Sequence, residues 1–211
     1  MSGPGGLYTP PPLSQPIDIA VLVSGSGTNL QALLDHQGSY RVATVVSDRP
    51  DAPALERARA AGAEAVVVTW TGDRDDFTHR VCDVLERAGV AWVVLAGFMR
   101  ILGREAMERF PDRIVNIHPS LLPAFPGANA VAKALEYGVK QTGVTVHFVD
   151  EEVDHGPIIA QVPVEVLPDD DVGTLHARIQ QQEHVLYPAV VDALVRGEIR
   201  VSGRKVEWRK Q

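Results

Sequence analysis

The feature that most constrains this fold is a regular alternation of short β-branched apolar runs with helix-like segments. The expected strands cover residues 17–23, 40–46, 63–69, 91–96 and 113–117, and the expected helices cover 29–36, 52–61 and 73–88. Strands and helices that alternate in this way form parallel sheets with helices on both faces. The chain is therefore expected to be an α/β protein with a three-layer, mostly parallel twisted sheet that binds ligands at the carboxyl ends of its strands.

The chain beyond about residue 120 follows a different pattern. Expected strands at 143–149 and 157–166 are joined by a short acidic loop, which predicts an antiparallel addition to the sheet. A helix over 172–196 follows, and then a short strand pair. Internal repeats and interdomain linkers are not evident, so residues 17–211 are expected to form a single domain. Residues 1–16 are rich in Gly and Pro and are expected to be a disordered leader.

The composition narrows the class of protein further. A formal net charge of -7 argues against nucleic acid as a ligand, and no apolar run is long enough to cross a membrane. Residues 1–16 lack the basic start and apolar centre of a secretory signal. Cys82 is the only cysteine, which fits a reducing compartment, and it is expected to be a plain buried residue. These features predict a cytoplasmic protein without a nucleic-acid or membrane partner.

A glycine-rich loop, SGSGTN at 24–29, follows the first expected strand and leads into a helix. Glycines let the backbone approach a ligand closely, and a helix N-terminus offers free N–H groups and a positive dipole end. Ser26, Gly27, Thr28 and Asn29 are therefore expected to bind an anion, and phosphate is the anion that this arrangement favours. The loop lacks the third glycine of a dinucleotide-binding motif and the lysine of a Walker loop. A tight turn with a Thr or Asn helix cap is the alternative.

Asn116 and His118 end a buried strand and carry the strongest catalytic signal. Residues two apart in a strand project to the same face, so both side chains should point together where Pro119 stops regular pairing. An amide donor beside an imidazole can stabilise a developing oxyanion, and histidine can shuttle a proton near neutral pH. A polar pair that only caps the strand is the alternative.

The loop between the two late strands contains four carboxylates at 150–154. Such a run is usually a solvated turn, but the Gly-Pro pair at 156–157 indicates a constrained loop. One carboxylate could fold back onto His118 and stabilise its protonated form. Spacing alone does not distinguish among the four candidates, which are Asp150, Glu151, Glu152 and Asp154.

Four motifs, in this order, resemble those of phosphoribosylglycinamide formyltransferase, a folate-dependent enzyme family of purine synthesis. They are SGSGTNLQ at 24–31, AGFMRIL at 96–102, NIHPSLLP at 116–123 and DHGP at 154–157. The resemblance covers roughly residues 17–200, and its specificity comes from the four motifs together. It implies a Rossmann-like formyltransferase fold with antiparallel C-terminal strands. It also implies transfer of a formyl group from 10-formyltetrahydrofolate, as co-substrate, to the amine of glycinamide ribonucleotide.

The same resemblance implies roles for individual residues. It assigns catalysis to Asn116, His118 and Asp154, the substrate phosphate to Ser26, Gly27, Thr28 and Asn29, and the substrate amine to Glu183 and Gln180. The folate-binding residues that it implies are Arg74, Met99, Arg100, Ile101, Leu102, Val149, Asp150 and Asp154. It further implies a cis peptide at Leu122-Pro123 and no metal. Some family members carry histidine where Asn129 stands, and His147 is expected to be a structural histidine near the site rather than a catalyst.

Several alternatives remain open. A formyltetrahydrofolate deformylase would use water as the acceptor, and a methionyl-tRNA formyltransferase would be expected to carry a further RNA-binding domain. A non-catalytic nucleotide- or folate-binding module would not need the three catalytic residues. A Rossmann dehydrogenase would need a third glycine and an acidic residue ending the second strand, for which Asp48 is a weak candidate. The resemblance leaves a homodimer open.

Overall fold

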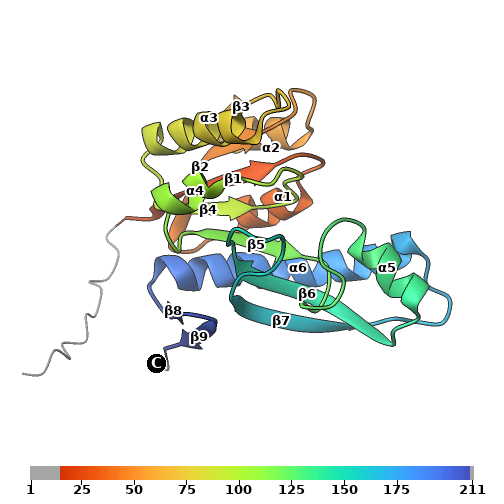
Figure 1. The fold of residues 1–211 in the computed structure, drawn as a ribbon. Helices are drawn as coiled ribbons and strands as arrows, with labels where there is room; N and C mark the ends of the chain where they lie inside the picture. The colour runs from red at the N-terminus through yellow and green to blue at the C-terminus, as the bar shows by residue number, and fades with distance from the viewer. Residues whose placement is uncertain (1–14, 210–211) are drawn as a thin grey trace, which may run out of the picture.

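The structure, a computed structural model, describes residues 15–209, so the expected leader at 1–16 lies almost wholly outside the described residues. A seven-stranded sheet runs through the centre of this part of the chain (Figure 1). Its strands are β1 (Ile17–Val23), β2 (Tyr40–Ser47), β3 (Glu64–Val67), β4 (Trp92–Leu95), β5 (Ile114–His118), β6 (Gln141–Phe148) and β7 (Ile158–Glu165).

The strand order β3-β2-β1-β4-β5-β6-β7 determines where a ligand can bind. Strands β1 to β5 run parallel, whereas β6 pairs antiparallel with both β5 and β7. The expected mostly parallel sheet and its antiparallel addition are both confirmed. The order reverses between β1 and β4, and at such a switch point the connections leave a crevice at the carboxyl ends of the strands.

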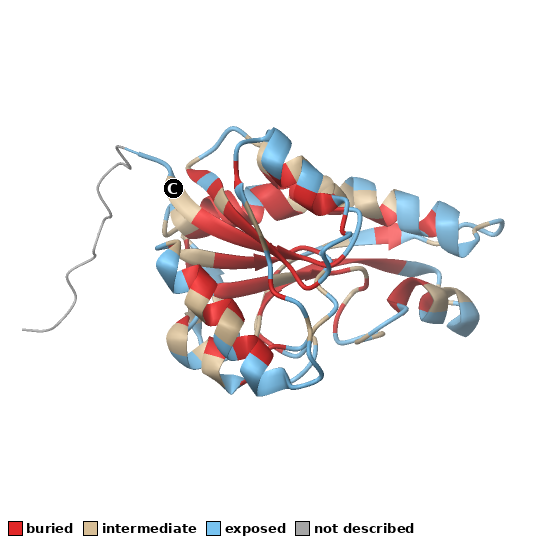
Figure 2. Cartoon of the chain, turned by 90° about the horizontal axis from the view of Figure 1, so that it is seen from above, coloured by how far each residue is buried: buried red, intermediate tan, exposed pale blue. Residues whose placement is uncertain are grey.

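Helices cover both faces of the sheet, so alternate strand residues pack into two apolar cores. Val21 of β1 belongs to the core shared with α1 (Thr28–Asp35), α2 (Ala54–Ala60) and α6 (Val172–Val195), whereas Leu22 belongs to the core shared with α3 (Arg74–Arg87). Figure 2 shows the buried strands between outer layers whose outward faces are exposed. Cys82 on α3 is buried as expected, and burial raises the pKa of its thiol to about 11. Among residues 15–209, no helix is both long and apolar enough to cross a bilayer.

Two short helices, α4 (Arg104–Arg109) and α5 (Ala130–Tyr137), have no expected counterpart. Within the described chain, neither begins with a side-chain cap: α4 follows Gly103, and α5 follows Asn129, whose φ is 62°. A side-chain cap is the main sequence signal for the start of a helix. Short helices without one are stabilised mainly by tertiary packing, so the sequence alone does not predict them. The Leu122-Pro123 peptide is cis, as expected.

Two aromatic residues attach the C-terminal elements to the sheet. Tyr187 of α6 is fully buried, and its hydroxyl lies 2.8 Å from the carbonyl oxygen of Leu95 and 3.1 Å from that of Val115. A hairpin of β8 (Ile199–Ser202) and β9 (Lys205–Trp208) follows α6 and confirms the expected strand pair. Trp208 fixes this hairpin to β7, since its Nε1 donates to the Ile159 carbonyl at 3.1 Å.

Candidate active site

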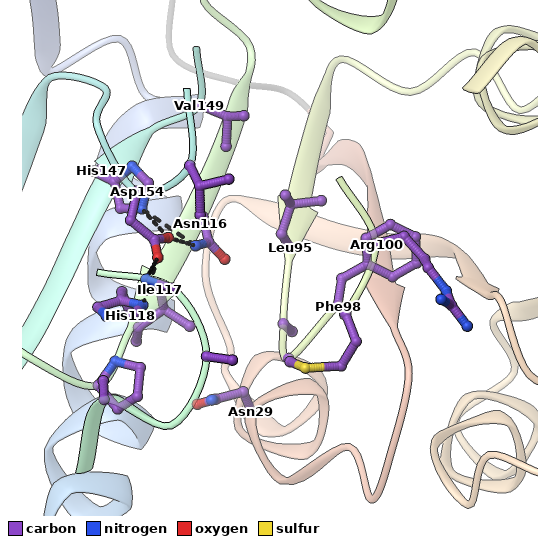
Figure 3. A pocket seen from close by; sticks show the side chains of 18 of the residues that line it. Asn29, Leu95, Phe98, Arg100, Asn116, Ile117, His118, His147, Val149 and Asp154 are labelled. Carbon is purple, nitrogen blue, oxygen red and sulfur yellow. Dashed lines mark hydrogen bonds and ion pairs between the residues drawn. The ribbon is translucent and has the colours of Figure 1, made fainter. Parts of the chain in front are cut away.

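A pocket of about 580 Å³ opens at the carboxyl ends of β1, β4 and β5, at the switch point of the sheet (Figure 3). Its walls are the glycine loop, the loop after β4, the end of β5, the acidic loop between β6 and β7, and one face of α6. Every predicted site residue except Arg74 lines this pocket. Arg74 instead begins α3, 3.6 Å from the carboxylate of Asp75, so its role stays a prediction.

The glycine loop takes its shape from contact with α2. Gly27 has a φ of 74°, and a Cβ at this position would lie only 2.6 Å from the Cβ of Ala54, so only glycine fits. The Ser26 carbonyl accepts a hydrogen bond from Arg57 Nε at 2.9 Å. Within the described residues no side chain caps α1, so a Thr or Asn cap is not the reason for this loop. The uncapped helix start remains suited to an anion.

The polar face of α6 meets the glycine loop at a buried carboxylate. Asn29 Nδ2 donates to Glu183 Oε2 at 2.9 Å, and Gln180 Nε2 lies 3.4 Å from Thr28 Oγ1. Glu183 is only 4% exposed, and burial raises the pKa of its carboxyl despite the hydrogen bond from Asn29. Among residues 15–209, the buried Asn29 Oδ1 has no hydrogen-bond partner. These two acceptors suit a ligand amine.

Asn116 and His118 point from β5 toward Asp154, which reaches them from the acidic loop (Figure 3). Asp154 Oδ2 lies 3.2 Å from His118 Nδ1 and accepts from the Gly127 N–H at 2.7 Å. Its other oxygen, Oδ1, lies 3.3 Å from Asn116 Nδ2. His118 Nε2 lies 2.9 Å from the Phe125 carbonyl, which can only accept. Both ring nitrogens of His118 thus face hydrogen-bond acceptors.

Asp154 is held as a carboxylate by its surroundings. Burial alone would raise the pKa of Asp154, but contact with His147, the Gly127 N–H and the charge of His118 together lower it below its usual range. The Asp154 backbone has a φ of 53°, an unfavourable conformation for a residue with a side chain. The surrounding contacts therefore fix both the charge and the direction of this side chain.

The other three acidic candidates point elsewhere. Asp150 Oδ2 lies 2.8 Å from His155 Nδ1, within the same loop. Glu151 and Glu152 are exposed. Of the four carboxylates that spacing left equal, Asp154 is the one in contact with His118.

His147 contacts the site from β6 and was expected only to be near it. The antiparallel register places it opposite Asn116, with its Nε2 3.2 Å from Asn116 Nδ2 and 3.6 Å from Asp154 Oδ1. Its Nδ1 lies 2.8 Å from the Phe148 carbonyl and so carries a hydrogen. Its Nε2 lies between the Asn116 amide and the Asp154 carboxylate, which fits a positioning role. A correct strand register is the signal that would have found it.

The wall formed by the loop after β4 is largely apolar. Met99 and Ile101 are 70% and 54% exposed, while Leu102 is buried beneath them. Val149 lines the same pocket from the end of the antiparallel pair. Exposed apolar side chains on a concave wall offer a binding surface for a flat, largely apolar ligand.

Arg100 lies at the edge of this wall. Its Nε donates to Asp48 Oδ2 at 2.7 Å, and its guanidinium carbon lies 5.0 Å from the ring centre of Trp70. Asp48 is the acidic residue after β2 that a dehydrogenase would direct at a ribose. Because this carboxylate is buried against Arg100, the dehydrogenase alternative loses its remaining support.

The arrangement places an uncapped helix start, a buried carboxylate and a histidine paired with a carboxylate around one pocket. Such groups can bind a phosphorylated amine and stabilise the oxyanion formed when that amine attacks an acyl carbon. In the part of the chain that the structure describes, no group of three or more His, Cys, Asp or Glu side chains could hold a metal ion.

Comparison with known proteins agrees with this chemistry. A family model described as formyl transferase matches residues 17–191. The phosphoribosylglycinamide formyltransferase of Mycobacterium tuberculosis H37Rv is 48% identical over 202 residues, which cover 92% of this chain and 92% of that protein. The enzyme of the same name from Escherichia coli K12 is 38% identical over 191 residues, covering 88% and 90% of the two chains.

Longer relatives and solved structures share the same region. The trifunctional purine biosynthetic protein adenosine-3 of Drosophila melanogaster is 43% identical over 192 residues, but the chain spans only 14% of that protein's length. The crystal structure of glycinamide ribonucleotide transformylase 1 from Symbiobacterium toebii matches with a TM-score of 0.91 at 46% identity, covering 99% of this chain and 100% of that one.

Proposed function

The chain belongs to the formyl transferase family, and we propose that it transfers the formyl group of 10-formyltetrahydrofolate to the amine of glycinamide ribonucleotide in purine biosynthesis. One feature of the pocket supports this best. Two pairs of side chains face the same pocket. One is Glu183 with Asn29 of the glycine loop, and the other is Asp154 with His118. The first pair suits a phosphorylated amine, and the second suits the carbon that this amine attacks.

The ribonucleotide is held from both ends in this proposal. Residues 26–29 and the start of α1 bind its phosphate, and Glu183 with Gln180 orients its amine. Glu183 accepts from the amine and keeps its lone pair directed at the formyl carbon. Positioning of two reactants in this way contributes about 7 to 11 kcal/mol in ideal cases.

The neutral amine attacks the formyl carbon directly, so no covalent enzyme intermediate forms. Asn116 Nδ2 and protonated His118 Nε2 donate to the resulting oxyanion. In the structure Asn116 Nδ2 contacts His147 Nε2 and Asp154 Oδ1, so one of its two hydrogens must turn from these contacts to the oxyanion. In the structure, His118 Nε2 is directed at the Phe125 carbonyl, so this hydrogen must be shared with the oxyanion or transferred to it. Asp154 keeps His118 protonated. Asp154 also passes the proton that the amine loses, through water, to the folate nitrogen that leaves.

Folate is proposed to lie along the apolar wall after β4, formed by Met99, Arg100, Ile101 and Leu102, and against the acidic loop at 149–154. The exposed Met99 and Ile101 provide the apolar contact that a pterin needs. Arg74 is proposed to meet the folate tail outside the pocket lining. The proposed partners are these two small molecules, and the proposed location is the cytoplasm.

An acceptor assay tests the proposal. The protein is supplied with 10-formyltetrahydrofolate and one acceptor at a time, which is the ribonucleotide, a tRNA charged with methionine, or water alone. Formyl transfer to the ribonucleotide only is the expected result. Hydrolysis at an equal rate without an acceptor would identify a deformylase, transfer to the tRNA would identify a different transferase, and folate binding without turnover would identify a binding module.

A further inference from the structure

We propose that Arg204, in the turn of the β8–β9 hairpin, is a positioning residue that holds the acidic loop at 149–156 in the shape that binds folate. The inference rests on the proposed function, because folate is the ligand assigned to that loop. The match to the family model ends at residue 191, so the hairpin lies beyond it. An element outside the matched region would then complete the site.

Arg204 contacts the loop at His155 through both of its terminal nitrogens. Nη2 donates to the His155 carbonyl at 2.9 Å, and Nη1 lies 3.3 Å from the ring Nε2. The other ring nitrogen of His155, Nδ1, lies 2.8 Å from Asp150 Oδ2 and carries the hydrogen, because a carboxylate only accepts. Arg204 Nη1 also lies 3.5 Å from Nδ1, so it contacts the imidazole ring as a whole and is not aligned with one ring nitrogen. The hairpin is thus joined through His155 to Asp150, which lines the pocket.

The acidic loop depends on such contacts because little of it is buried. Residues 151–153 and 155 are exposed. Arg104 of α4 also reaches the loop, but it lies 3.6 Å from Glu151 between exposed side chains, and such pairs contribute little. Gly156 is packed so closely that a Cβ there would lie 1.9 Å from the Phe148 carbonyl. The chain is therefore fixed on the C-terminal side of Asp154 by Gly156 and by the contact of Arg204 with residue 155.

The position of Asp154 gives this contact a consequence for catalysis. Its φ of 53° is a strained conformation that persists only because neighbouring contacts hold it. Arg204 holds the adjacent residue, His155, by its backbone carbonyl. The hairpin itself is fixed, since Trp208 bonds to β7 and Val201 and Val206 pack against the main core. Arg204 thus links the strained segment to the sheet by a route separate from the two ends of the loop.

Arg204→Ala tests the proposal, with Lys205→Ala as the matched control. The control removes the same charge from the neighbouring residue, and no hydrogen bond or ion pair joins the Lys205 side chain to another residue in the described range. In Arg204→Ala we expect the KM for 10-formyltetrahydrofolate to rise about tenfold. This is the change expected if the loop adopts its folate-binding conformation about a tenth of the time, because the apparent affinity falls by that fraction. The KM for the ribonucleotide should stay unchanged. Arg204→Lys should restore part of the folate affinity lost in Arg204→Ala. A lysine can reach the His155 carbonyl, but its single nitrogen cannot contact the carbonyl and the ring together.

Amide hydrogen exchange over 150–155, in protein without added substrates, provides a readout independent of folate. We expect faster exchange there in Arg204→Ala than in Lys205→Ala and the wild type. Equal exchange and equal folate KM in the two variants would overturn the role of Arg204. Failure of the wild-type protein to bind or use the folate would instead refute the proposed function, and faster exchange in Arg204→Ala alone would still support the contact.

Discussion

Asp154→Asn should remove the charge opposite His118 while keeping the size of the side chain and an oxygen that can accept from Gly127. Unit charges 3.2 Å apart attract by about 5 kcal/mol at an effective dielectric constant of about 20. Removing the charge of Asp154 also removes the desolvation cost of a buried carboxylate, which limits the net loss of stability. We therefore expect the free energy of unfolding to fall by about 1–3 kcal/mol.

The effect of Asp154→Asn on turnover should be larger than its effect on stability. A neutral His118 would donate less effectively to the oxyanion, and loss of one such donor typically lowers kcat about 100- to 1000-fold. The KM for the ribonucleotide should change little, because Glu183 and the glycine loop are untouched. Absorbance of the formyl folate measures turnover, and urea unfolding of the same samples measures stability.

The pH dependence of this variant provides a second check. The folded protein lowers the pKa of Asp154, so the carboxylate stabilises the fold above its ordinary pKa of about 3.9. This stabilisation is lost as the pH falls through the lowered value. The difference in unfolding free energy between wild type and variant should thus shrink as the pH falls into the acid range. Near wild-type turnover in a folded Asp154→Asn protein would refute the reasoning.

Two substitutions and one labelling experiment test other parts of the structure. Burial raises the pKa of the Glu183 carboxyl, so the free energy of unfolding falls as the pH rises from the ordinary pKa of a glutamate through this raised pKa. Glu183→Gln should therefore raise the free energy of unfolding at pH 7 by about 1 kcal/mol, measured by thermal unfolding. The same substitution should increase the KM for the ribonucleotide. Unchanged stability would contradict the cost assigned to that charge. Gly27→Ala should lower the free energy of unfolding by about 1–3 kcal/mol and weaken ribonucleotide binding, because the φ of Gly27 is 74° and the new Cβ would clash with Ala54. Unchanged ribonucleotide affinity in isothermal titration would contradict this prediction. The thiol of Cys82 should react with a disulfide reagent at pH 8 only on unfolding, since burial raises its pKa to about 11; rapid labelling of native protein would show that the thiol is accessible.

Local patterns in the sequence predict those features that depend on a single element. The period-two alternation of a strand is enough to place Asn116 and His118 on one face, and the structure brings them together at the pocket. The same local patterns give β1 its observed bounds, Ile17–Val23, and place the end of α6 within one residue. Hydrophobic periodicity is written into neighbouring residues, so no knowledge of other elements is needed.

Local sequence patterns do not predict features that depend on the packing of one helix, strand or loop against another. His147 faces Asn116 only because of the antiparallel register between β5 and β6. Asp154 differs from Asp150 through a backbone φ of 53°, which tertiary contacts impose and residue type does not reveal. Arg204 reaches the loop only because the hairpin lies against β7. Each case requires the relative placement of segments that are separated along the chain.

The hydrogen bond from Asn29 to Glu183 joins residues 154 positions apart, so the pocket is assembled late in synthesis. The glycine loop and the parallel strands leave the ribosome well before α6, and chains fold from the N-terminus as they emerge. A nascent chain that ends before Glu183 can therefore form much of the sheet while one wall of the pocket is still missing. The proposed amine site is therefore complete only once α6 has packed against the sheet.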